Sequence, residues 1–114
     1  MSDRMSHHAY VLSCRAKAAE MAAAIVAGSM PVLEGCHLLD QLGADVEVPE
    51  NDPDFGAFKL IQSETDTLPI GPAREHWAPN VLASLEADIQ AAIAWAKPLA
   101  IPACQSVVER FGPQ

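Results

Sequence analysis

The sequence predicts an all-α protein, a small bundle of four to five helices with an acidic loop between the second and third helices. Apolar residues recur at intervals of three and four along most of the chain, and no stretch alternates with a period of two. Alanine accounts for 20 of the 114 residues and only six are aromatic, which favours closely approaching helices. A chain of this length fits one domain, so residues 1–114 are expected to form a single helical domain with residues 1–6 frayed.

The first helix is expected over residues 6–27, because an apolar stripe runs along it at helical spacing and Gly28 is a natural stop. Ser29 offers an N-cap for a second helix over residues 30–43, and Pro31 is tolerated in its first turn. The stripe of the first helix consists of Val11, Cys14, Ala18, Met21, Ala22 and Ile25.

An acidic segment over residues 45–51 has no helical period and is interpreted as an exposed loop. A strong helix start follows it: Asp52 can cap, Pro53 fits the first helical position, and Asp54 lies at the positive end of the helix dipole. This third helix is expected to end near Ser63. Its apolar anchors are Phe55, Phe58 and Ile61.

A turn-rich connection follows and includes one helical turn over residues 72–77. The fourth helix, over residues 79–97, is the clearest element of the chain. A final helix to Phe111 is expected, and Pro98 and Pro102 imply a break or kink where it leaves the fourth. The core stripe of the fourth helix consists of Leu82, Leu85, Ile89, Ile93 and Ala96.

The net charge of −8 is concentrated in residues 40–66, which hold eight acids against one base, Lys59, and so account for −7 of it. The other bases are dispersed, so no cluster exists of the kind that binds nucleic-acid phosphates. The sequence therefore predicts an acidic surface and argues against a nucleic-acid partner. The eight acids are Asp40, Asp45, Glu47, Glu50, Asp52, Asp54, Glu64 and Asp66.

No pattern in the chain predicts a metal, a cofactor or a catalytic residue. Glu34 and His37 have the spacing of a di-iron motif, but such a site needs two of these pairs, and this one falls on the polar side of its helix. A calcium loop over residues 51–56 would place Pro53 and Phe55 where oxygen ligands must stand. There is no nucleophile elbow, and His7 and His8 are assigned to the frayed terminus. Three cysteines fall on apolar faces and are expected to be buried and reduced: Cys14, Cys36 and Cys104.

The longest apolar run near the start, residues 21–28, is far shorter than the roughly 20 residues of a membrane span. Lys17 and Glu20 interrupt the apolar segment, which argues against a signal peptide. We therefore expect no transmembrane helix, no membrane partner and a cytoplasmic location.

Glu64 and Asp66 differ from the other acids because they fall near the negative C-terminal end of the third helix, where a carboxylate is unfavourable. The compensating charge is either internal, from Arg74 or the following backbone amides, or external, from a basic partner. We favour the internal explanation, which makes residues 63–66 a structural knot and leaves residues 45–54 as the exposed acidic face.

Several strings in the chain together resemble a family of small bacterial proteins without an established activity. The resemblance spans about residues 24–111 and implies a small bacterial helical protein. Members of that family tend to place a capping serine before the proline of the fourth helix, where this chain has Ala78. The strings are Glu34-Gly35-Cys36, Asp52-Pro53-Asp54-Phe55, the run from Ile61 through Ser63-Glu64-Thr65-Asp66 and Leu68-Pro69 to Gly71, Arg74, and His76-Trp77.

Three functional hypotheses follow. The first is a non-enzymatic binding protein whose acids engage a basic protein, in the manner of an immunity protein, an antitoxin or a nucleic-acid mimic. The second is a small-ligand-binding protein or an enzyme with a cleft closed by Trp77. The third is a homo-oligomeric scaffold, for instance a dimer, whose copies pack through Trp95 and alanine faces. The partner-binding residues of the first hypothesis are Asp45, Glu47, Glu50, Asp52, Asp54, Glu64 and Asp66. Those of the second are Glu64, Asp66, Arg74 and His76.

Overall fold

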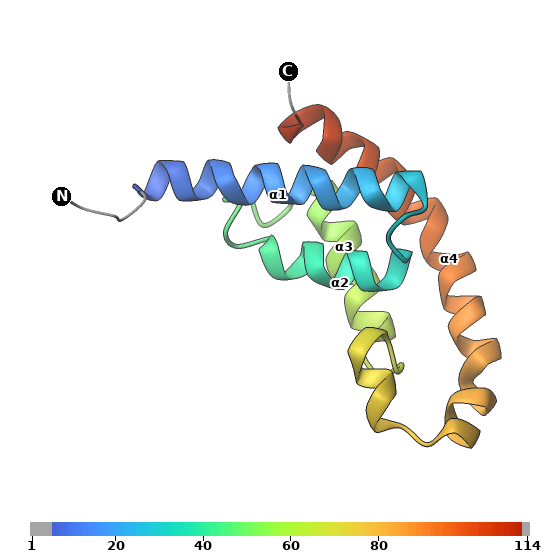
Figure 1. Ribbon diagram of the computed structural model, residues 1–114. Helices are drawn as coiled ribbons and strands as arrows, with labels where there is room; N and C mark the ends of the chain where they lie inside the picture. The colour runs from blue at the N-terminus through green and yellow to red at the C-terminus, as the bar shows by residue number, and fades with distance from the viewer. Residues whose placement is uncertain (1–5, 113–114) are drawn as a thin grey trace.

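Residues 6–112 fold into four α-helices and one 3₁₀ helix: α1 (His7–Ala27), α2 (Val32–Leu42), α3 (Pro53–Thr65), η1 (Gly71–His76) and α4 (Pro79–Phe111). This computed structural model describes residues 6–112, and at residues 72 and 73 it describes the backbone alone. No strand occurs within that span, which confirms the all-α class, and a loop joins α2 to α3 as expected (Figure 1). The expectation of a frayed start falls mostly on residues 1–5, which lie outside the described residues.

Helix α1 begins immediately after Ser6, whose side-chain oxygen accepts a hydrogen bond from the Ala9 amide at 3.1 Å. This N-cap satisfies one of the amides that have no partner within the helix. His7 and His8 therefore lie in the first turn of α1, and their assignment to a frayed terminus was wrong.

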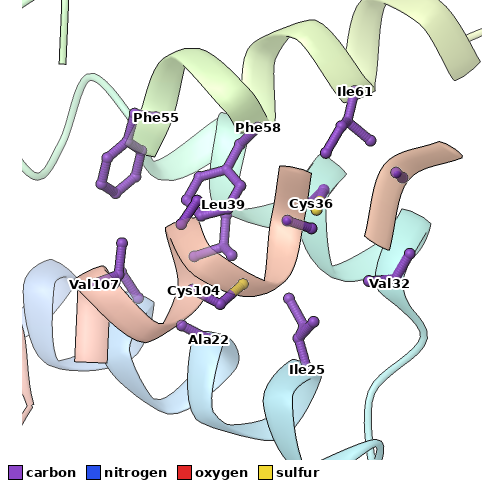
Figure 2. Close-up of a cluster of buried hydrophobic side chains, with 14 of the residues drawn as sticks. Ala22, Ile25, Val32, Cys36, Leu39, Phe55, Phe58, Ile61, Cys104 and Val107 are labelled. Atoms are coloured by element: carbon purple, nitrogen blue, oxygen red, sulfur yellow. The ribbon is translucent and has the colours of Figure 1, made fainter. Parts of the chain in front are cut away.

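One hydrophobic core is formed by α1, α2, α3 and the second half of α4 (Figure 2). Phe55 and Phe58 on α3 meet edge to face, with ring centroids 5.3 Å apart. Small residues on α1 and α4 allow these two helices to approach each other closely. The larger side chains that fill the core come mainly from α2 and α3. The fully buried small residues include Ala18, Ala22, Ala96 and Ala100.

The three cysteines are free and buried, which confirms the sequence-based expectation. Burial raises the pKa of the Cys36 thiol to about 12, with the nearby Cys104 adding to the shift. Burial likewise raises the pKa of Cys104 to about 11, with a contribution from Asp54. Since the thiolate is the reactive form, these shifts disfavour reaction at Cys36 and Cys104, whose side chains pack in the core.

Helix α2 begins at Val32, two residues later than the sequence suggested, because Ser29 does not cap it. The Ser29 hydroxyl donates to the Ala24 carbonyl at 3.2 Å and so closes the end of α1 instead. Gly28 ends α1 in the left-handed conformation, with φ of 84°, as expected of a glycine at this position.

Helix α3 begins as the sequence predicted. The Asp52 carboxylate accepts a hydrogen bond from the Phe55 amide at 3.1 Å, and Pro53 occupies the first turn. The helix runs two residues past its expected end near Ser63, because Thr65 is buried and its hydroxyl donates to the Ile61 carbonyl at 2.6 Å.

Helix α4 is continuous for 33 residues, so the expected fourth and final helices are one element. Pro98 and Pro102 lie inside it, and its axis changes direction along its length (Figure 1). The helix starts after Ala78 without a side-chain cap. Within the expected stripe, Ile89 and Ala96 are buried and the other three residues are half-buried, because little covers the first half of the helix.

By length and composition, α4 is also the one helix in the described part of the chain that could cross a membrane. Its most apolar 18-residue window has a mean hydropathy of 1.2, and 28% of that window is buried. Core helices of other folds pass the same test, and the second half of α4 contributes several residues to the core. The expectation that the chain contains no transmembrane helix stays a prediction.

Candidate functional site

The seven acids predicted to bind a partner fall into three groups. Asp52 and Asp54 begin α3 and point into the protein, whereas Asp45, Glu47 and Glu50 belong to the loop before it. Glu64 and Asp66 are exposed at the far end of α3. The acidic stretch is therefore not one continuous face.

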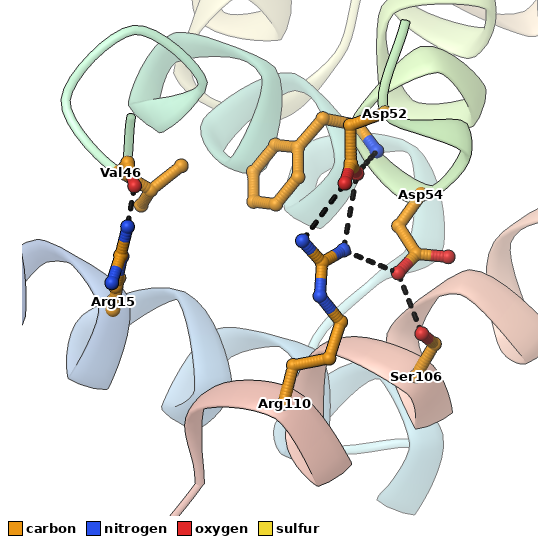
Figure 3. Close-up of polar contacts among 7 residues, drawn as sticks. Arg15, Val46, Asp52, Asp54, Ser106 and Arg110 are labelled. Atoms are coloured by element: carbon orange, nitrogen blue, oxygen red, sulfur yellow. Dashed lines mark hydrogen bonds and ion pairs between the residues drawn. The ribbon is translucent and has the colours of Figure 1, made fainter. Parts of the chain in front are cut away.

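Asp52 and Asp54 bind Arg110, which comes from the last turn of α4 (Figure 3). The Arg110 guanidinium donates through Nη2 to Asp52 at 2.8 Å and through Nη1 to Asp54 at 2.8 Å. Ser106, one turn earlier on α4, donates its hydroxyl hydrogen to the same Asp54 oxygen at 2.6 Å. The side chains of Asp52 and Asp54 are only 7% and 13% exposed, so their placement on an exposed face was wrong.

This cluster changes the acid–base properties of its members. Burial opposes ionisation of Asp52, but hydrogen bonds from Arg110 and the Phe55 amide, together with the Arg110 charge, outweigh it and hold the pKa of Asp52 below its ordinary value. The hydrogen bond to Asp52 is the largest cause of a raised pKa for Arg110. Both groups are thus charged at neutral pH and fix the start of α3 against α4.

The loop between α2 and α3 is held in place at Val46, whose side chain is fully buried. Arg15 on α1 donates its Nε hydrogen to the Val46 carbonyl at 2.9 Å (Figure 3). Glu47 then adopts a left-handed backbone with φ of 55°, and its carboxylate lies 2.5 Å from Nε2 of His7. Among the described residues, Glu47 is the one non-glycine residue with a positive φ.

These contacts direct the loop acids outward. The Glu47 side chain is half exposed, Glu50 is exposed and Asp45 is half-buried. A short segment thus presents three carboxylates from a backbone that α1 holds in place. We define Asp45, Glu47 and Glu50 as the acidic loop surface.

Two arginines lie beneath this loop and flank Phe111. The guanidinium carbon of Arg15 lies 5.3 Å from the Phe111 ring centroid, and that of Arg110 lies 4.9 Å from it. Arg15 and Arg110 therefore act on the loop and on the start of α3 from the inner side. Neither role was predicted from the sequence. The four-residue spacing of Ser106 and Arg110 was the one available signal, since it places them on the same face of a helix.

Arg74 does not pair with Glu64 or Asp66, so the predicted compensation of these two acids by Arg74 was wrong. Its guanidinium lies 3.9 Å from the Glu86 carboxylate on α4. The end of α3 is held instead by His37 of α2, whose Nε2 lies 2.7 Å from the Thr65 hydroxyl oxygen. Because the Thr65 hydroxyl hydrogen goes to the Ile61 carbonyl, Nε2 of His37 must be the donor.

Burial lowers the pKa of His37, while the negative charges of Asp40 and Asp66 act in the opposite direction. Asp66 is thus close enough to His37 to influence its titration. The described residues contain no group of three His, Cys, Asp or Glu side chains placed to hold an ion, so none of them completes a ligand set with Glu34 and His37.

A separate groove of about 350 Å³ lies between α2, η1 and α4. Its polar side chains include Glu34, Arg74, Glu86 and Lys97, and isoleucines form much of its apolar lining. Glu34 approaches Gly71, whose left-handed backbone (φ of 61°) turns the chain into η1. Of the four residues predicted for a ligand or catalytic cleft, only Arg74 lines this groove. Glu64, Asp66 and His76 do not line it, and neither does Trp77, expected to close the cleft.

Comparison with known proteins gives no family: no family model, no curated protein and no solved structure matches the chain.

Proposed function

We propose that this chain is a non-enzymatic acidic binding protein that engages a basic protein through the acidic loop surface, in the manner of an immunity protein, an antitoxin or a nucleic-acid mimic. One observation carries the proposal. The loop is held by Val46 and Arg15 from the inner side, while the side chains of Glu47 and Glu50 are exposed and that of Asp45 is half-buried.

A fixed loop suits binding because little conformational freedom remains to be lost when a partner docks. Clustered carboxylates also attract a basic protein before contact, and salt weakens this attraction over a Debye length of about 10 Å at 0.1 M. Lys59 is the one base within residues 40–66, so little positive charge in that stretch opposes the surface. The same field repels nucleic-acid phosphates, which argues against a nucleic-acid partner.

The roles of the other predicted acids follow from their positions. Asp52 and Asp54 support the site by fixing α3 beside the loop, and we do not expect them to contact the partner. Glu64 and Asp66, at the opposite end of α3, form at most an outlying contact.

The test is a salt-stepped pull-down from the native host with three forms of the protein. The first is the wild type and the second reverses the loop charges through Asp45→Lys, Glu47→Lys and Glu50→Lys. The third is a matched control that reverses three exposed acids elsewhere, Glu20→Lys, Glu75→Lys and Glu109→Lys.

We expect the wild type and the control to retain the same basic protein at low salt, and the loop variant to lose it. Isothermal titration with the purified partner then measures affinity against salt concentration. A partner that is not basic, or equal retention by the loop variant, contradicts the proposal.

A second candidate function is binding of a small amphipathic ligand in the groove, favoured by its volume of about 350 Å³ and its mixed lining. Arg74 and Lys97 suit an anionic head group, and Ile89 and Ile93 suit an aliphatic tail. Octanoate is a suitable probe: we expect it to shift the methyl NMR signals of Ile89 and Ile93 but not of Val26, and Arg74→Ala to weaken the effect. Unmoved isoleucine signals would exclude this candidate.

A further inference from the structure

The first half of α4 exposes large apolar side chains along one line of its surface. Val81, Trp95 and Leu99 are 37%, 41% and 38% exposed, although each would gain from burial. Leu85 and Ala92 lie between them and are half-buried. When Asp88 is added to these five residues, the intervals between neighbours along the chain are four, three, four, three and four residues. This is the heptad spacing of a coiled-coil seam. We call these six residues the α4 seam: Val81, Leu85, Asp88, Ala92, Trp95 and Leu99.

The protein's own core uses mainly a neighbouring face of the same helix, and of the six seam residues only Ala92 packs against it. Ile89, Ala96 and Ala100 are buried, and the groove side chains Glu86 and Lys97 also fall outside the seam. On the outer side the seam is bordered by exposed small residues, which permit the backbone of another helix to come close. These bordering residues are Ser84, Ala87, Ala91 and Ala94.

We infer that two copies of this chain associate through their α4 seams, in an antiparallel pair with its two-fold axis close to residue 90. In that arrangement Val81 faces Leu99 and Leu85 faces Trp95 at each end. Asp88 faces Ala92 rather than the Asp88 of the second copy, whereas a parallel pair would bring the two Asp88 carboxylates together. The antiparallel arrangement is thus the one that does not place the two Asp88 carboxylates opposite each other.

Charge distribution also favours a second copy as the occupant. The first half of α4, residues 79–99, carries Glu86, Asp88 and Lys97 and so a net charge of only −1, which means that two α4 surfaces meet with little repulsion. The loop between α2 and α3 lies at the other end of the molecule from the first half of α4 (Figure 1). Pairing through α4 therefore keeps the two acidic loops apart and leaves both uncovered.

Length supports a specific pair. From Val81 to Leu99 the seam spans about 27 Å at a rise of 1.5 Å per residue, enough for six side-chain layers. This inference is independent of the proposed function, because it uses none of the acidic loop residues.

Sedimentation equilibrium tests the pair through two charge insertions. We expect the wild type to dimerise and Trp95→Glu or Leu99→Glu to weaken the dimer at least tenfold. Leu12→Glu is the matched control, since Leu12 is 48% exposed on α1 and outside the seam, and it should leave the dimer unchanged. Circular dichroism establishes that each variant keeps its helices. A wild type that stays monomeric up to about 1 mM, or a dimer that Trp95→Glu leaves intact, overturns the inference.

Cysteine substitution tests the orientation. The double variant Val81→Cys with Leu99→Cys should form disulfide-linked dimers on treatment with diamide. Diamide oxidises the two facing thiols to a disulfide and is itself reduced. Val81→Cys alone should not, because its nearest neighbour across the pair is Leu99. Cross-linking of the single variant shows a parallel pair and overturns the stated geometry.

A membrane is the alternative occupant. If the chain is monomeric and co-sediments with phosphatidylcholine vesicles in a way that Trp95→Glu abolishes, the seam contacts lipid and the inference is wrong.

Discussion

Asp52 combines two roles in one carboxylate. It caps α3 through the Phe55 amide, and it binds Arg110 from a helix 58 residues further along the chain. The capping role is local, so the sequence Asp52-Pro53-Asp54 was enough to predict it. The ion pair depends on where α4 ends in space, which no local pattern encodes. For that reason Asp52 was correctly assigned as a cap and wrongly placed on an exposed face.

Substitution of Asp52 separates the two roles. Asp52→Asn keeps a competent cap but removes the charge, so we expect the free energy of unfolding to fall by about 1–2 kcal/mol, limited because Arg110 keeps Asp54. Asp52→Ala also removes the cap and should cost about 1 kcal/mol more. Urea denaturation at pH 7 measures both values. Glu50→Gln, on the exposed loop, is the control and should change stability by less than about 0.5 kcal/mol.

The contribution of Asp52 should also depend on pH in a defined direction. Its pKa in the folded protein lies below the ordinary value of 3.8, so its stabilising effect is complete above that value and is lost as the pH falls through the folded pKa. The difference in stability between wild type and Asp52→Asn should therefore shrink below about pH 4. Urea midpoints from pH 7 to pH 3 measure it, and a difference that grows on acidification contradicts the assignment.

His37 offers a test of charge placement at the end of α3. Burial lowers its pKa, and the negative charge of Asp40 partly offsets this effect. Asp40→Asn should therefore lower the pKa of His37 further, as measured by NMR titration of the imidazole. Glu64→Gln is the control, since Glu64 is not among the groups acting on His37, and an unchanged or raised pKa in Asp40→Asn would refute the arrangement.

At the scale of whole elements, residues that act within a single helical turn predicted the helix boundaries well. Residues whose role depends on contact with another helix predicted them less well. Ser6, Gly28 and Asp52 bound α1 and α3 as their chemistry suggests. Ser29 was misassigned because the end of α1 competes for its hydroxyl. The proline pair in α4 could be interpreted as a break or as a kink; the helix is continuous through both prolines and packs against α1 and α3. The apolar periodicity predicted that one face of α4 lies in the core. It could not show that half of this face is not covered by another helix.

The packing of α1 against α2 can be tested with one glycine and a matched control. A methyl group added at Gly35 would lie 2.4 Å from Cδ1 of Ile25, so Gly35→Ala should destabilise the protein by about 1–3 kcal/mol. A methyl group added at Gly56 on α3 would have no neighbouring atom within 4 Å. Gly56→Ala should therefore stabilise the protein by about 0.5–1 kcal/mol through helix propensity. Thermal and urea unfolding measure both. Equal effects of the two substitutions would show that α1 and α2 are not so closely packed.

Across the whole molecule, basic and acidic side chains lie on different sides of the acidic region. Arg15 and Arg110 lie on the inner side of the acidic region, where they hold the loop and the start of α3. Asp45, Glu47, Glu50, Glu64 and Asp66 remain on the outer side. The excess of acids in residues 40–66 is evident from the sequence, but which of them have partners is not: Asp52 and Asp54 pair with Arg110 and Glu47 lies beside His7, whereas the other exposed acids are left to repel one another.

That repulsion should make stability depend on salt. Exposed like charges destabilise the folded protein, so raising NaCl from 10 to 150 mM should increase the free energy of unfolding by about 0.5 kcal/mol. Urea is the suitable denaturant because it carries no charge. Neutralising the loop through Asp45→Asn, Glu47→Gln and Glu50→Gln should raise stability at low salt and flatten the salt dependence. Replacing Glu20, Glu75 and Glu109, which lie outside the acidic stretch, by Gln removes the same number of charges and should have a smaller effect. A fall in stability with added salt would mean that ion pairs such as Arg110 with Asp52 dominate over repulsion among the exposed acids.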